Sequence, residues 1–158
     1  MHVTLIRHGR AVSSTTELGD SGRVLSKEGR EQVRNTASGV ASQDVKPTDV
    51  LSSPLVRAVQ TAELIAAGLD YRGEIEAYAW LRPEGRVSEL IDHLGQLDTG
   101  SDVVFCGHEP FMSSAASALL GYHVSGFGTG VAFRIELDVA EAGRGDLLWR
   151  WLAGQIVR

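Results

Sequence analysis

The sequence contains only one cysteine in 158 residues, Cys106. A single cysteine excludes an intrachain disulfide and a cysteine cluster that holds a metal. It also excludes phosphatase chemistry that needs an arginine after a cysteine and five intervening residues, because that position is Met112. The apolar neighbours of the cysteine, residues 103–105, predict a buried and unreactive thiol.

Long hydrophobic runs and an excess of positive charge are also missing. No apolar run approaches the length that spans a membrane, and the first residues lack the apolar segment of a signal peptide. We therefore expect a cytoplasmic protein without a membrane partner. The net charge of −5 argues against nucleic acid as a partner. An anionic ligand would need a local cationic pocket.

Motifs that indicate metal or nucleotide chemistry are absent too. The segment that begins at His108 lacks the second histidine of a zinc-protease helix, and no Gly-Lys-Ser/Thr phosphate-binding loop occurs. The alternating glycines of residues 125–130 precede a predicted strand, so they are interpreted as a turn. We expect no metal and no cofactor.

The residues that are present alternate between strand and helix patterns. Composition is typical of a soluble globular protein, and no linker or repeat divides the chain, so we expect a single domain over residues 1–158. Residues 10–25 show no periodicity and predict a loop. The predicted strands are 2–7, 49–53, 74–81, 102–107, 131–137 and 147–152. The predicted helices are 26–42 with Ser26 as N-cap, 54–69 and 110–121 with proline as the first residue, and 86–97.

This order of elements predicts an α/β fold. Strands that alternate with helices favour a three-layer α/β/α sandwich, in which a mostly parallel sheet is covered on both faces. The last two strands are expected to form a hairpin, which makes the sheet mixed. Trp149 and Trp151 alternate along the final strand, and we expect them to pack in the core or at the sheet edge.

Three of the predicted strands end in residues that suit anion binding. The first ends at Arg7 and His8, and the second is followed by Arg57 one turn into the next helix. Another strand ends immediately before His108. Ligands bind beyond the carboxyl ends of strands in open α/β sheets, where helix N-termini also favour anions. Each residue alone is weak evidence, but together they predict a phosphate pocket.

These segments resemble the signatures of a known family. The segments "LIRHGRA" (5–11), "SSPLVRAVQTAE" (52–63) and "CGHEP" (106–110) are similar, in order and spacing, to those of the histidine phosphatase superfamily, whose fold is phosphoglycerate mutase-like. The resemblance extends over almost the whole chain. The short length, without a large cap insertion, is most similar to the SixA-type phosphohistidine phosphatases.

The resemblance implies a role for each matching residue. His8 is the implied nucleophile, and Arg7, Arg57 and His108 are the other members of the implied phosphate pocket. The attacking imidazole must be neutral, so its other nitrogen is expected to donate a hydrogen bond, for instance to a backbone carbonyl. Gly9 is expected to let the backbone turn tightly and approach the phosphate.

Some positions depart from the family pattern. Members that act on alkyl phosphates usually carry an asparagine in the first loop, where this chain offers Ser13 or Ser14, and an acid after the third strand, where it offers Glu84. Glu84 is as well explained by a solvated turn. Arg10 adds a further cation, either to recruit an acidic substrate or only facing water. Glu109 is interpreted as an acid that suits a helix start.

The sequence therefore leaves several functions open. The leading hypothesis is a phosphatase that hydrolyses phosphohistidine in a protein, such as a signalling phosphotransfer domain, through a phospho-His8 intermediate. Phosphohistidine is favoured because its imidazole leaves more readily than an alkoxide and depends less on an acid. The alternatives are a small-molecule phosphomonoesterase with Glu84 as general acid, a non-catalytic phosphate-binding module and, least favoured, a mutase.

Overall fold

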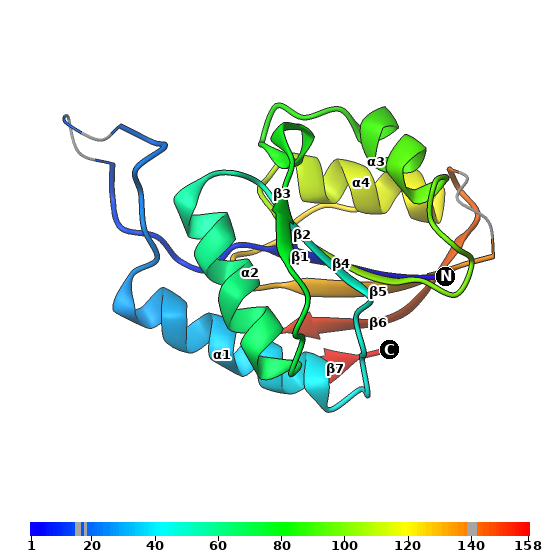
Figure 1. Ribbon diagram of the computed structural model, residues 1–158, viewed down its shortest axis with the longest axis horizontal. Coiled ribbons are helices and arrows are strands. Elements are labelled where there is room, and N and C mark those ends of the chain that lie inside the picture. Colours follow the sequence, from blue (N-terminus) through cyan, green and yellow to red (C-terminus); the bar gives the residue numbers. More distant parts are fainter. Residues whose placement is uncertain (15–16, 18, 139–141) are drawn as a thin grey trace.

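Seven strands form one sheet in the order β3-β2-β4-β1-β5-β6-β7, with helices on both faces (Figure 1). A computed structural model describes residues 1–14, 17, 19–138 and 142–158. The strands are β1 (His2–Arg7), β2 (Asp49–Ser52), β3 (Ile75–Ala77), β4 (Asp102–Gly107), β5 (Ala132–Leu137), β6 (Gly145–Leu152) and β7 (Gln155–Val157). The helices are α1 (Lys27–Ala41), α2 (Val56–Gly68), α3 (Val87–Leu94), α4 (Phe111–Leu120) and a 3-10 turn, η1 (Ala79–Leu81). The predicted α/β fold is confirmed.

The sheet has a parallel part and an antiparallel part. β1 pairs in parallel with β4, β4 with β2, and β2 with β3, whereas the pairs β1–β5, β5–β6 and β6–β7 are antiparallel. In the parallel part Arg7 is opposite Gly107, and Ser52 is opposite Cys106. The carboxyl ends of β1, β2 and β4 therefore lie side by side at one edge.

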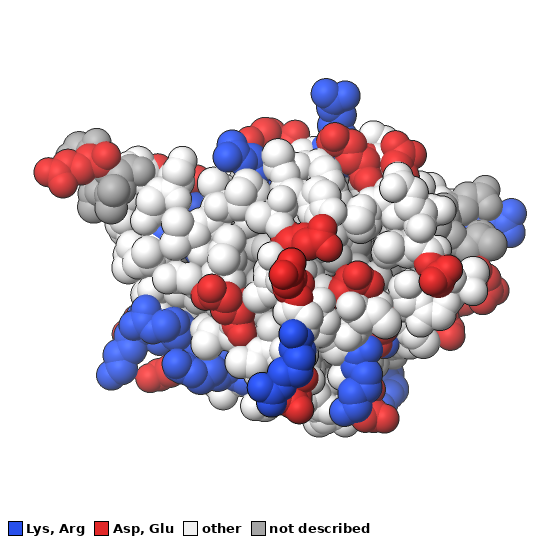
Figure 2. Space-filling view, in the orientation of Figure 1, with Lys and Arg blue, Asp and Glu red and all other residues white. Residues whose placement is uncertain are grey.

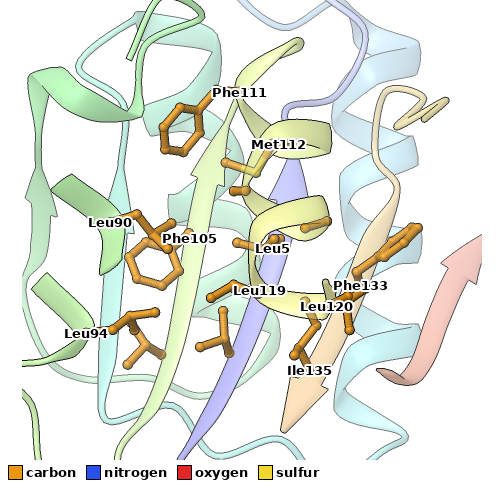
Figure 3. Packing of buried hydrophobic residues seen from close by; sticks show 14 of the residues in the cluster. Leu5, Leu90, Leu94, Phe105, Phe111, Met112, Leu119, Leu120, Phe133 and Ile135 are labelled. Atoms are coloured by element: carbon orange, nitrogen blue, oxygen red, sulfur yellow. The ribbon is translucent and has the colours of Figure 1, made fainter. Parts of the chain in front are cut away.

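Alternating side chains divide the core into two layers. In β4, for example, Val103 and Phe105 face one layer, and Val104 and Cys106 face the other. Helices α3 and α4 cover the first layer, whose close packing against β1, β4 and β5 is seen in Figure 3. Helices α1 and α2 cover the second layer. No helix among the described residues has the length and apolar character needed to cross a membrane.

Several element boundaries differ from the prediction. The strand expected over residues 74–81 is only β3 followed by η1, since β3 pairs on one side only, with a partner of four residues. Helix α2 begins at Val56, because Leu55 still has an extended backbone and serves as the N-cap. Pro110 is likewise the N-cap of α4. The short strand β7, after a turn through Ala153 and Gly154, was not predicted.

The expected C-terminal hairpin is confirmed, with β6 starting two residues earlier than predicted. Residues 139–141 of its connection, and residues 15, 16 and 18 of the predicted first loop, lie outside the described residues. Trp149 is buried in the core, and Trp151 packs half-buried against the sheet-facing side of α1 at Gly39. Cys106 is fully buried, and burial raises the pKa of its thiol to about 12.

Candidate active site

A cavity of about 540 Å³ opens where the carboxyl ends of β1, β2 and β4 meet. Arg7 and His8 reach it from the end of β1, Arg57 from the first turn of α2 and His108 from the end of β4. The fold thus brings together all four residues that the sequence places in a phosphate pocket. The other described residues of the cavity wall are Arg10, Ala11, Asp20, Arg23, Ser26, Pro83, Glu109 and Thr129.

His8 is held in one orientation and one tautomer. Its ring Nδ1 donates a hydrogen bond to the carbonyl of Gly9 at 2.7 Å, the kind of contact expected from the sequence. Nε2 therefore carries the lone pair and accepts a hydrogen bond from Arg57 Nε at 3.3 Å. The ring is 6% exposed. Burial, together with the charges of Arg57 and Arg7, lowers the pKa of His8 to about 4, so the ring is neutral near pH 7.

Gly9 serves a different purpose from the one expected. It is absent from the described cavity wall, and a Cβ there would lie 2.6 Å from Val33 Cγ2 and 2.8 Å from the carbonyl oxygen of Gly29. The missing side chain therefore allows α1 to pack closely against the end of β1. The backbone N–H of Gly9 donates to Thr61 Oγ1 at 3.2 Å, which ties the histidine loop to α2.

Arg57 links the nucleophile position to the loop that precedes α1. Besides Nε, which contacts His8, its NH1 donates to the backbone carbonyl of Asp20 at 2.9 Å, and its NH2 lies 3.0 Å from the Asp20 carboxylate. The same carboxylate accepts a hydrogen bond from Arg23 at 3.1 Å. These hydrogen bonds, mainly from Arg23, lower the pKa of Asp20. The Asp20 carboxylate thus binds N–H donors of the Arg57 guanidinium that a phosphate would also bind.

His108 lies beside His8, with 4.8 Å between ring centroids. Its Nε2 is 2.8 Å from the hydroxyl oxygen of Ser53, which follows β2. With that hydroxyl as donor, the ring proton is on Nδ1, which is buried and has no partner among the described residues. The pKa of His108 is lowered to about 3. Burial is the largest cause, and the nearby His8 and Arg57 contribute less. The ring is therefore neutral near pH 7.

Arg7 is fixed by the backbone rather than by a carboxylate hydrogen bond. Its NH1 donates to the carbonyl of Phe127 at 2.7 Å, and its buried Nε has no hydrogen-bond partner within the described residues. Burial lowers the pKa of Arg7, while the charge of Glu109 opposes that shift. A guanidinium remains charged at neutral pH even when its pKa is lowered in this way.

The remaining expected residues separate into two groups. Arg10 does line the cavity, with an exposed side chain and a backbone N–H that donates to Gln32. Ser13 is exposed and is not among the residues of the described cavity wall. Glu84 is exposed as well, and its Oε1 lies 4.0 Å from NH1 of Arg82. It is not among the residues of the described cavity wall, although its neighbour Pro83 is. The structure therefore does not bring Ser13 or Glu84 to the cavity.

Five further residues of the site were not singled out as functional from the sequence. Asp20 and Arg23 lie in a loop without periodicity, so no pattern indicated them. The buried hydroxyls of Ser53 and Thr61 were detectable as polar residues inside two signature segments. The sequence explains Glu109 as an acid that suits a helix start, whereas in the structure this residue lines the cavity. Its position directly after His108 is the feature of the sequence that could have indicated a place in the site.

The arrangement is suited to a tetrahedral oxyanion. Among the described lining residues four arginines face two carboxylates, and the two buried imidazoles are neutral. Planar guanidinium forks match the oxygens of phosphate, and the His8 lone pair faces the same space. No group of three or more histidine, cysteine or acidic side chains among the described residues is arranged to hold a metal ion.

Comparison with known proteins gives a consistent result. The family model of the histidine phosphatase superfamily (branch 1) matches residues 3–82. The phosphohistidine phosphatase SixA of Escherichia coli strain K12 is 29% identical over 153 residues, which cover 95% of this chain and 92% of that protein.

Solved structures agree with this match over nearly the whole chain. The protein histidine phosphatase SixA complexed with tungstate superposes with a TM-score of 0.86 at 29% identity and covers 95% of this chain and 96% of its own. A putative SixA from Agrobacterium tumefaciens has a TM-score of 0.83 at 21% identity and covers 96% of this chain and 97% of its own, which shows the shared fold.

Proposed function

Because the chain belongs to the histidine phosphatase superfamily and is a phosphatase with a histidine nucleophile, we propose that it hydrolyses phosphohistidine in a protein substrate. The observation that carries this proposal is the state of His8. A neutral ring, oriented by the Gly9 carbonyl, presents its Nε2 lone pair to a cavity lined by arginines. The partner we propose is a protein of the histidine-phosphotransfer type.

The arginines bind the phosphoryl group. Arg7 and Arg57 contact its equatorial oxygens, Arg57 exchanging its contacts with Asp20 and with His8 Nε2 for the substrate, and His108 donates from Nδ1. Phosphoryl transfer depends mainly on positioning and on charge stabilisation, because the reacting oxygens carry the charge that develops. The guanidinium of Arg7, fixed by the Phe127 carbonyl, and that of Arg57, which extends from the first turn of α2, supply that stabilisation at any working pH.

Chemistry then proceeds in two displacements. His8 Nε2 attacks phosphorus, the bond from phosphorus to the substrate nitrogen breaks, and phospho-His8 forms. Water attacks this intermediate in the second step, which releases inorganic phosphate and restores the lone pair on Nε2. The hydrogen bond from Nδ1 to Gly9 is maintained throughout and compensates the positive charge that develops on the ring.

Two arguments favour phosphohistidine over a sugar or other alkyl phosphate. The acid that an alkoxide leaving group requires was expected at Glu84, which is exposed and does not line the described cavity wall. SixA of Escherichia coli, which this chain matches over 95% of its length, is named a phosphohistidine phosphatase. The geometry around His8 favours a catalyst over a non-catalytic phosphate-binding module.

A comparison of substrates tests the proposal. The wild-type protein and His8→Ala are incubated with a phosphohistidine-bearing phosphotransfer protein and with a panel of sugar phosphates, and released phosphate is measured. We expect rapid release from the phosphoprotein by the wild type and at least a 1,000-fold loss in His8→Ala, on the order seen when a nucleophile is removed. Turnover of sugar phosphates alone would contradict the substrate. Wild-type rates in His8→Ala would contradict the mechanism.

A further inference from the structure

The cavity wall contains two carboxylates, and they are placed differently. Asp20 is engaged by Arg57 and Arg23, with 60% of its side chain exposed. Glu109 is half-buried and follows His108 directly. Ser113, one turn into α4, donates to Glu109 Oε1 at 2.6 Å, which fixes the carboxylate. Within the described part of the chain no group donates a hydrogen bond to its second oxygen, Oε2.

Glu109 also marks the boundary between two hollows of the surface. The cavity around His8 adjoins a groove of about 670 Å³ between the start of α4 and residues 123–128. Glu109 and Arg7 are the two described residues that line both. A phosphoryl group held by Arg7 therefore lies beside this carboxylate, and its leaving group can pass from the cavity into the groove.

A carboxylate at this place opposes phosphate binding but suits one kind of leaving group. Its negative charge is like that of the phosphoryl oxygens, so it does not help to bind them. The imidazole of phosphohistidine, in contrast, carries a second ring nitrogen that is positively charged and donates a hydrogen bond when protonated. An alkyl or aryl ester offers no such donor.

We propose that Glu109 recognises the leaving imidazole of a phosphohistidine substrate by accepting a hydrogen bond from its distal ring N–H. This inference rests on the proposed function and assigns a specificity residue to it. As the bond from His8 Nε2 to phosphorus forms, the bond from phosphorus to the substrate nitrogen breaks, and its electron pair stays on that nitrogen. The proton on the distal nitrogen stays in place, so the ring departs as neutral imidazole.

The test compares Glu109→Gln with wild type on two substrates and one inhibitor. The substrates are a phosphohistidine-bearing phosphotransfer protein and p-nitrophenyl phosphate, whose nitrophenolate leaves without a proton. Inorganic phosphate serves as the competitive inhibitor. Glutamine keeps the size and can still accept from Ser113, but it removes the charge. Glu84→Gln is the matched control, since it removes an exposed acid outside the described cavity wall.

We expect Glu109→Gln to lower the rate of phospho-His8 formation from the phosphoprotein at least tenfold. Turnover of p-nitrophenyl phosphate and inhibition by phosphate should be unchanged or stronger, and Glu84→Gln should match wild type throughout. Equal losses on both substrates would overturn the proposal and indicate a role in the steps that both substrates share, such as binding of the phosphoryl group. Unchanged phosphohistidine turnover would also overturn it. Absence of phosphohistidine turnover in the wild type would instead refute the proposed function on which it rests.

Discussion

Arg57 Nε donates a hydrogen bond to His8 Nε2 at 3.3 Å, so a cation lies against the atom that attacks phosphorus. This contact has two consequences. Together with burial, it keeps the His8 ring neutral, and it places the guanidinium where a bound phosphoryl group must lie.

Replacing Arg57 by lysine should reduce turnover strongly. An ammonium is a single point charge and cannot hold two phosphoryl oxygens as a planar fork does. We expect kcat/KM for a phosphohistidine protein to fall about 100-fold, comparable to the loss of one strong transition-state donor. Arg10→Lys, at the exposed mouth of the cavity, is the control and should remain within a few-fold of wild type. A loss below threefold in Arg57→Lys would contradict the role of the fork.

Asp20 should compete with phosphate for Arg57. In Asp20→Asn the carboxylate no longer neutralises the guanidinium, so inorganic phosphate should inhibit about two- to fivefold more strongly, a change typical of a partly exposed ion pair. The inhibition constant of phosphate measures this effect. Asp44→Asn changes the net charge equally at a distant exposed ion pair and should leave the constant unchanged. Weaker inhibition in Asp20→Asn would show instead that Asp20 positions Arg57 for the substrate.

Thr61 should be needed to hold the histidine loop on α2. Its buried hydroxyl accepts from the Gly9 N–H and donates to the Arg57 carbonyl at 2.7 Å. Thr61→Val keeps the shape but leaves the buried Gly9 N–H unpaired, which should lower the free energy of unfolding by about 1–3 kcal/mol. Urea denaturation measures this loss. Thr61→Ser, which preserves both hydrogen bonds, should recover most of it, and equal stability of the valine variant and wild type would refute the role.

The two buried imidazoles should make the protein acid-sensitive. The unfolded rings take up protons near pH 6.5, whereas burial keeps the folded rings neutral down to a pKa of about 4 for His8 and about 3 for His108. The unfolded state therefore binds more protons as pH falls below 6.5, and stability falls with it. By pH 5 the loss is about 2 kcal/mol per ring.

Thermal unfolding at pH 7 and pH 5 measures this dependence. His108→Asn should lose less stability over that interval than wild type, because one of the two rings no longer titrates. His123→Asn changes an exposed histidine and should keep the wild-type loss. Identical losses in wild type and His108→Asn would show that the buried ring does not govern the acid sensitivity.

The sequence predicted the sheet and the four residues at its carboxyl edge because both follow from short-range patterns. Short apolar runs located β1, β2 and β4, and the parallel pairing of these strands brings Arg7, Arg57 and His108 to one cavity. The polar residue types at the strand ends were visible directly. A general rule about where α/β sheets bind ligands then supplied their proximity.

Features that depend on packing between distant segments were not predictable in the same way. No periodicity marks the loop that brings Asp20 to Arg57, and no pattern says that Gly9 is small because α1 approaches it. Whether an acid after β3 faces the cavity depends on the turn that follows η1, and here this turn exposes Glu84 and places Pro83 at the wall. Tertiary contacts determine these three features, and local residue patterns carry little information about tertiary contacts.

Transfer of the phosphoryl group to His8 tests the central claim most directly. A phosphotransfer protein labelled with ³²P on histidine is mixed with an excess of enzyme, and the reaction is quenched in alkali, which preserves phosphohistidine, at intervals of milliseconds. The account predicts that label appears on His8 before inorganic phosphate and that His8→Ala acquires none and releases none. Release of phosphate without prior label on His8, or at the wild-type rate from His8→Ala, would contradict it.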